Sequence, residues 1–137
     1  MAHFLMTLSA NDVNAIRQEA YVLIPIGARQ HRPGFWQWPA AYQPVPGGHD
    51  EFSITLNDLG SSTTSRVYDV PERSEFRLCT DVYRLGPDYE GCILVVEYHG
   101  GSSYSTAVLS PGDPGWEEAE RSLTDVTPSG TKSWGYR

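Results

Sequence analysis

The chain has 137 residues, in which 17 acidic side chains outnumber 10 basic ones and give a formal net charge of -7. One domain, 1–137, is the natural organisation because ~100–200 residues usually form one, and an apolar content of 39% suffices for a hydrophobic core. No apolar run approaches the ~18 residues of a membrane-spanning helix, and the N-terminus lacks the basic region of a signal peptide. We therefore expect a cytoplasmic domain with Cys79 and Cys92 reduced.

Motifs of common enzyme classes are missing. Lys132 is the single lysine, and it does not lie in the Gly-Lys-Ser/Thr triplet of a nucleotide-binding loop. Gly-x-Ser-x-Gly does not occur, and the four histidines and two cysteines are too scattered for a metal site. These observations favour a non-catalytic binding module with no metal and no cofactor.

The first third of the chain predicts one helix, one strand and a long loop. Ser9-Ala10-Asn11-Asp12 has the form of a capping box and predicts a helix over about 10–18. The β-branched apolar run 20–26 predicts a buried strand. Residues 27–50 keep no period, and a loop of this length in a compact domain is usually functional or disordered. Its aromatic residues argue against disorder; they are Phe35, Trp36, Trp38 and Tyr42.

Short strands dominate the rest of the chain. Strict alternation in 51–57 directs Phe52, Ile54 and Leu56 towards a core. A helical turn or two is expected within 110–123, followed by a loose polar tail. Five or six short strands with one or two small helices indicate a barrel or a sandwich. The further strands are expected at 64–70, 74–78, 91–98 and 103–109.

The negative charge is unevenly distributed. Residues 29–84 hold six arginines against seven acids, whereas 86–126 hold one arginine against eight acids. This distribution disfavours loose electrostatic binding to nucleic acid but permits recognition by a local arginine cluster. Arginine in place of lysine suits that role, because the guanidinium forms bidentate contacts with guanine or phosphate.

Two segments, which we call the arms, carry donors that suit base edges. The first arm lies within 27–38; its donors are Arg29, Gln30, His31, Arg32 and Gln37. The alternative is that its arginines are solvated and its tryptophans form a small core under the loop. The second arm, 71–78, places Arg73, Glu75 and Arg77 on one face of an extended segment. The alternative there is a surface ion-pair ladder worth little energy.

Three stretches carry a family resemblance: EAYVLIPIGARQHRPGFW, DEFSITLND and PERSEFRLCTDVYRLGPDYEGCILVVEYHGGSSYSTAVL. Together they resemble the C-terminal DNA-binding domain of NgoFVII-type restriction endonucleases, a B-three-like fold, over roughly residues 19–110. The resemblance implies a mainly β, open pseudobarrel of about six or seven short strands with one or two short helices. The core would span 19–110, with a helix at about 10–18 before it and an acidic extension, 111–137, after it.

The resemblance also implies a wrench-like grip on double-stranded DNA, with both arms in the major groove. The protein would read a specific or modified sequence in a bacterial restriction or defence system, with a separate nuclease subunit as a possible partner. Arg29→Ala or Arg77→Ala would abolish binding while the fold survives, and Trp36 with Trp38 could enclose a modified or flipped base. The candidate DNA-binding residues are Arg29, Gln30, His31, Arg32, Trp36, Gln37, Trp38, Arg73, Ser74, Glu75, Arg77 and Arg84.

Two other functions fit the sequence. A carbohydrate-binding module would use exposed tryptophan and tyrosine rings to stack on sugars. An acidic protein-interaction module or DNA mimic would use residues 112–125, for which a solvated helix face is the simpler interpretation.

Overall fold

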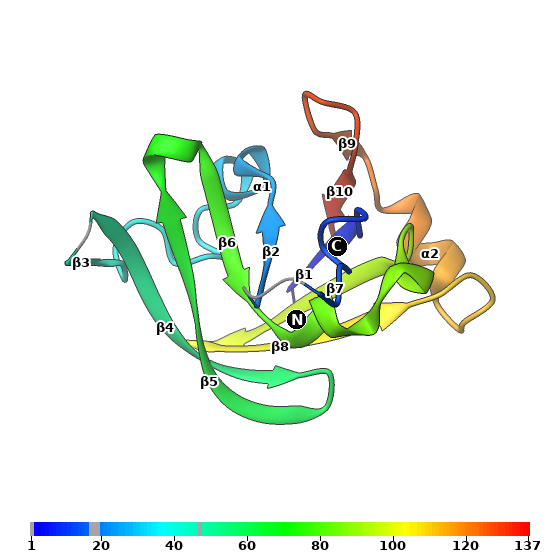
Figure 1. The fold of residues 1–137 in the computed structure, drawn as a ribbon, viewed down its shortest axis with the longest axis horizontal. Coiled ribbons are helices and arrows are strands. Elements are labelled where there is room, and N and C mark those ends of the chain that lie inside the picture. Colours follow the sequence, from blue (N-terminus) through cyan, green and yellow to red (C-terminus); the bar gives the residue numbers. More distant parts are fainter. Residues whose placement is uncertain (1, 17–19, 47) are drawn as a thin grey trace.

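The computed structural model describes residues 2–16, 20–46 and 48–137, which form one strongly curved β-sheet (Figure 1). Two short α-helices, α1 (Ile26–His31) and α2 (Trp116–Arg121), accompany it within the described residues. Single-turn or two-turn 3-10 helices are η1 (Pro71–Arg73), η2 (Asp81–Leu85) and η3 (Pro87–Tyr89). The strands are β1 (Ala2–Thr7), β2 (Tyr21–Ile24), β3 (Gln43–Val45), β4 (His49–Asp58), β5 (Ser61–Val70), β6 (Glu75–Cys79), β7 (Ile93–Gly100), β8 (Ser103–Leu109), β9 (Asp125–Val126) and β10 (Ser133–Tyr136).

The strand order is β2-β6-β5-β4-β8-β7-β1-β10-β9, and β3 pairs with β4 beside this path. Only β4 and β8 pair in parallel; the other described pairs are antiparallel. The prediction of a mainly β, open, barrel-like fold with one or two short helices is confirmed. The described part contains ten strands, more than the six or seven expected.

The central strands were predicted correctly, and in β4 alternation also identified the face that packs on the core. In β4, Ile54 and Leu56 are buried in the core and Phe52 packs against it from a half-buried position. The predicted strand 103–109 coincides with β8, and 91–98 matches most of β7. In β4 the period of two decides which face of the sheet is covered.

The N-terminal region differs from the prediction. Residues 2–7 form β1, which pairs with both β7 and β10 inside the sheet. Residues 10–16 contain turns and no helix, and residues 17 and 18 of the expected helix lie outside the described residues. The capping-box contacts do form, with Ser9 N donating to Asp12 Oδ2 at 2.9 Å and Asp12 N to Ser9 Oγ at 3.3 Å. They close one turn, from which no helix continues in residues 10–16, and the Asp12 carboxylate takes part in a buried ion pair described below.

The C-terminal region is also more ordered than a loose tail. The expected acidic helical turns are present as α2, but the chain then returns to the sheet as β9 and β10. Trp134 of β10 belongs to the core, and Phe4 to Met6 of β1 pair with Tyr136 to Trp134. The barrel core therefore extends beyond 19–110 to both ends of the described chain.

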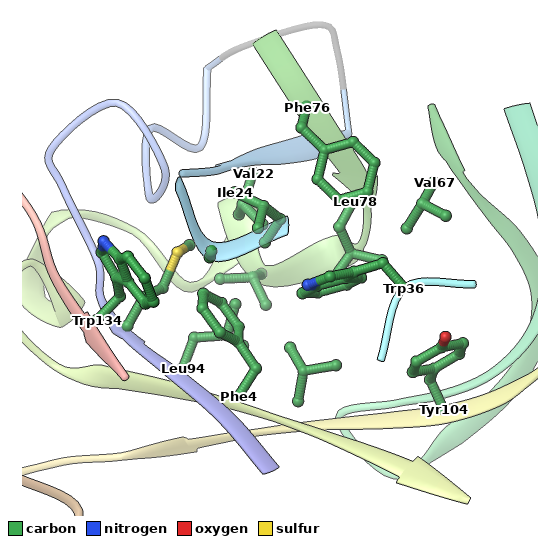
Figure 2. Packing of buried hydrophobic residues seen from close by; sticks show 14 of the residues in the cluster. Phe4, Val22, Ile24, Trp36, Val67, Phe76, Leu78, Leu94, Tyr104 and Trp134 are labelled. Carbon is green, nitrogen blue, oxygen red and sulfur yellow. The ribbon is translucent and has the colours of Figure 1, made fainter. Parts of the chain in front are cut away.

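Described parts of the long segment 27–50 contribute to the core. The segment contains α1, and its Trp36 lies fully buried against Phe4, Phe35 and Phe76 in the centre of the core (Figure 2). Trp36 Nε1 donates to the hydroxyl of Tyr136 at 2.9 Å. The tryptophans of this segment are thus structural in part, as the alternative interpretation proposed.

The two ends of the sheet are joined by one side chain. Lys132, which immediately precedes β10, is buried and donates from Nζ to the carbonyl of Leu23 in β2 at 2.6 Å. The same ammonium lies 2.8 Å from Oδ2 of Asp12, which is completely buried. We call this junction between β2 and the β9–β10 region the seam.

Candidate nucleic-acid interface

Both arms lie at the same end of the barrel. Strands β2 and β6 are antiparallel, and Ile24 at the end of β2 pairs with Phe76 at the start of β6. Helix α1 begins two residues after Ile24, and η1 ends shortly before Phe76. In Figure 1, η1 and α1 accordingly stand together at the open end of the barrel.

The tips of both arms are exposed. Gln30, His31 and Arg32 are exposed at the end of α1, where the Arg32 guanidinium lies 5.0 Å from the centre of the Tyr136 ring. Arg73 and Ser74 are exposed in η1 and at its end. These five side chains form what we call the arm tips, and they offer guanidinium, amide, imidazole and hydroxyl groups to a ligand.

Arg29 supports the first arm from below. Its Nη1 donates to Oδ1 of Asp69 in β5 at 2.9 Å, and both side chains are only 11% exposed. Its guanidinium lies 4.0 Å from the ring centre of Trp38 and 5.0 Å from that of Phe76. Arg29 therefore ties α1 to β5 and β6 and is not an exposed donor of the kind the sequence suggested.

Arg77 plays the equivalent role in the second arm. Its Nε donates to Oε1 of Glu75 at 2.8 Å, its Nη2 donates to the same oxygen, and its Nη1 donates to the Tyr68 hydroxyl at 3.2 Å. The rings of Tyr21 and Tyr68 lie 4.2 and 5.6 Å from the guanidinium. Burial lowers the pKa of Arg77, but the hydrogen bonds to Tyr68 and Glu75 outweigh it and raise the pKa above its ordinary value. The expected ion-pair ladder exists between Glu75 and Arg77, but it is largely buried, and Arg73 lies outside it in η1.

Three other candidates are placed differently from the expectation. Trp36 is in the core and cannot touch DNA in this structure, so Trp36 and Trp38 do not enclose a surface pocket for a base. Trp38 is half-buried beneath Arg29, and Gln37 Nε2 donates to Gly34 O at 2.7 Å and to the Tyr98 hydroxyl at 3.0 Å. Both residues therefore hold the loop in place.

Arg84 is separated from the arm tips. It lies in η2, which follows the far end of β6, and it donates from Nε to the hydroxyl of Tyr83 at 3.1 Å. The structure does not bring it together with Arg32 or Arg73.

A third element at this end was not predicted. The loop between β9 and β10 lines a cavity of about 260 Å³ with the roots of both arms. Its hydroxyls contact one another, Thr127 Oγ1 with Ser129 Oγ at 3.3 Å and Ser129 Oγ with Thr131 Oγ1 at 2.9 Å. The only signal in the sequence was the density of hydroxyl residues in TPSGTKS, and only the pairing of β10 with β1 brings that segment here.

The acidic helix lies on another surface. Ala119 of α2 packs with Leu5 of β1 and Ile93 of β7, on the side of these strands opposite Phe4 and Leu94 of the main core. Glu117, Glu118 and Glu120 are exposed. These three carboxylates therefore lie on a different surface from the arm tips.

No protein-family model matches the chain, and no curated protein matches it. No helix of the described residues is both long and apolar enough to cross a membrane. Among solved structures, the N-terminal domain of Helicobacter pylori LlaJI.R1 has a similar fold, with a TM-score of 0.58 and 14% sequence identity. The similarity covers 98% of this chain and 97% of that one. At this identity the comparison establishes that the two chains share a fold.

Proposed function

We propose that this protein is a non-catalytic module that binds double-stranded DNA and reads a specific or modified sequence in the major groove. The observation that carries the proposal is the exposure of the five arm-tip side chains at one end of the barrel, on arms held by buried ion pairs. The resemblance of the sequence to DNA-binding domains of restriction endonucleases supports a role in restriction or defence, and the fold shared with the N-terminal domain of Helicobacter pylori LlaJI.R1 is consistent with it. A separate nuclease subunit would supply cleavage.

The chemistry of the arm tips suits base recognition. Arginine forms bidentate contacts with guanine O6 and N7, and glutamine does so with adenine N6 and N7. Arg32 and Gln30 occupy one arm, and Arg73 occupies the other. Arg29 with Asp69 and Arg77 with Glu75 fix the arms before the ligand arrives, which lowers the entropic cost of binding.

The charge balance favours specific over random binding. Arg29 and Arg77 are neutralised by Asp69 and Glu75, so they contribute little to a phosphate-binding surface. Non-specific affinity depends on the number of phosphates neutralised by free cations. Weak non-specific binding raises the ratio by which a cognate site is preferred.

The carbohydrate alternative has lost its main support. Trp36 and Trp134 are buried, and Trp38 and Trp116 are half-buried, so no fully exposed tryptophan platform is found among the described residues. No observation favours the acidic-interaction alternative over a solvated helix face.

Selection from a random duplex library, repeated with methylated DNA, tests the proposal. We expect one sequence or one modified sequence to be enriched, and Arg32→Ala or Arg73→Ala to weaken its binding by about 10- to 100-fold. Arg121→Ala is the matched control, because Arg121 is an exposed arginine on α2. Absence of enrichment from both libraries, or equal losses in the control and the arm variants, would contradict the proposal.

A further inference from the structure

The cavity beside the arms combines an apolar floor with a polar rim. Its floor is formed by residues at the end of β2 and the start of α1, together with Phe76 of β6. Its rim is polar and comes from the second arm and the β9–β10 loop. The polar residues that line the cavity are Ser74, Glu75, Thr127, Ser129, Thr131 and Lys132. The Lys132 ammonium is engaged by Leu23 O and Asp12 Oδ2.

The volume of this cavity suits one heterocycle. At about 260 Å³ it falls below the ~300–1,000 Å³ of sites for drug-sized ligands. Its position between the roots of the arms means that a groove held by the arm tips would lie over its mouth. Enzymes and readers that extrude a base place it in such a pocket, against apolar side chains and polar groups that read its Watson–Crick edge.

The polar groups of the rim have a defined donor and acceptor pattern. Arg77 directs two N–H groups to Oε1 of Glu75, and Oε2 receives no hydrogen bond from the described residues. Oε2 of Glu75 therefore remains as an acceptor for N–H donors of a ligand. The hydroxyls of Ser129 and Thr131 can rotate to donate to ring acceptors.

This pattern distinguishes among the bases. The Watson–Crick edge of cytosine presents one amino donor followed by two acceptors, N3 and O2. Guanine is a larger ring system and offers only one acceptor, O6, to the two hydroxyl donors, and thymine has no exocyclic amino group. Adenine shares the amino donor but is a larger ring system and has only one further acceptor on this edge.

We propose that the cavity between the arms receives a cytosine base extruded from the duplex, with Glu75 accepting from its amino group and the Ser129 and Thr131 hydroxyls donating to N3 and O2. The apolar floor formed by Ile24, Pro25 and Ile26 contacts the ring and accommodates a 5-methyl group. This inference rests on the proposed function, since it assigns a ligand to the same end of the molecule. It replaces the Trp36–Trp38 pocket, which the structure does not contain.

The test places a fluorescent cytosine analogue, whose emission rises on unstacking, at each cytosine of the selected duplex in turn. We expect a rise at one position on binding, and binding about tenfold tighter when the partner of that cytosine is abasic, because the unpairing cost is then removed. Ser129→Trp fills the cavity from an exposed loop position and should abolish the rise while lowering affinity at least tenfold. Ser102→Trp, an exposed position in the turn between β7 and β8, is the matched control.

Each outcome separates this inference from the proposed function. Specific binding without a rise at any cytosine, unaffected by Ser129→Trp, overturns the extruded base and leaves major-groove reading intact. A rise only with an analogue at an adenine position overturns the assignment to cytosine. Failure to bind any duplex overturns the proposed function, and this inference with it. Glu75→Gln provides a second test, which does not depend on filling the cavity. This substitution should lower the affinity for the cytosine-containing site more than the affinity for the same site with an abasic residue in place of that cytosine.

Discussion

Arg29→Ala should destabilise the fold, although from the sequence we expected it to affect only DNA binding. The substitution leaves Asp69 without its partner at a position where both side chains are only 11% exposed. Removing one member of a buried ion pair typically costs about 3–5 kcal/mol, because the remaining charge stays desolvated. Loss of the guanidinium from above Trp38 removes a further ~0.5–2 kcal/mol of cation–π attraction.

Urea unfolding followed by tryptophan fluorescence measures this cost, since Trp36 and Trp134 are buried and report the core. Arg66→Ala provides the matched control: Arg66 pairs with Glu51 at 2.7 Å, but its side chain is 51% exposed. Exposed pairs contribute ~0–1 kcal/mol, so the control should unfold almost as the parent does. The reasoning is refuted if Arg29→Ala lowers the free energy of unfolding by no more than Arg66→Ala.

The result also decides how DNA-binding data on Arg29 are interpreted. A variant that loses both binding and ~3–5 kcal/mol of stability identifies Arg29 as a support of the arm. A variant that loses binding at unchanged stability would identify it as a base or phosphate contact.

Other expected outcomes concern the seam, alkaline pH and salt. Lys132→Met should lower the free energy of unfolding in urea by about 3–5 kcal/mol, because it leaves the buried carboxylate of Asp12 without its partner. A decrease below ~1 kcal/mol would contradict a stabilising role of this ion pair. Burial raises the pKa of three tyrosine hydroxyls above the ordinary 10.0. Their contribution to stability should therefore be complete below about pH 10 and be lost above it, as the unfolded chain ionises and the folded chain does not. A urea midpoint unchanged up to about pH 11.5 would show that these hydroxyls titrate normally. The residues concerned are Tyr42, Tyr104 and Tyr136. For cognate DNA, the slope of log K against log[salt] should be shallow, about −2 to −3, because Arg32 and Arg73 are the only two arginines among the five arm-tip side chains and few cations are left to neutralise phosphates; a slope near −8 would require a basic surface beyond the arms.

The local sequence pattern is most informative for a strand that has one apolar face and one polar face. Residues 51–57 alternate between apolar and polar side chains, so a period of two identified the face of this strand that packs on the core. Strand β1, AHFLMT, has apolar residues on both faces, since Leu5 packs under α2 while Phe4 and Met6 face the core. Such a run gives no alternation, and its role depends on pairing with β7 and β10, which are distant in sequence.

The residue types in the sequence located the two arms. They did not predict which of the arginine side chains are exposed and which are buried in ion pairs. Clustered arginine, glutamine and histidine identified 29–32 and 73–77. Whether each guanidinium is free depends on partners such as Asp69, forty positions away from Arg29, and Tyr68. The β9–β10 loop could not be assigned to the site, because no local pattern shows that its hydroxyls meet the start of α1.

The position of the single lysine makes the seam accessible to chemistry. Apart from the amine at the N-terminus, Lys132 carries the only primary amine of the chain, and in the folded state it is 7% exposed and paired. An amine-selective acylating reagent should therefore modify this side chain only in molecules whose two sheet ends have parted. The labelling rate would then follow local opening of the barrel, separately from global unfolding, without any engineered reporter.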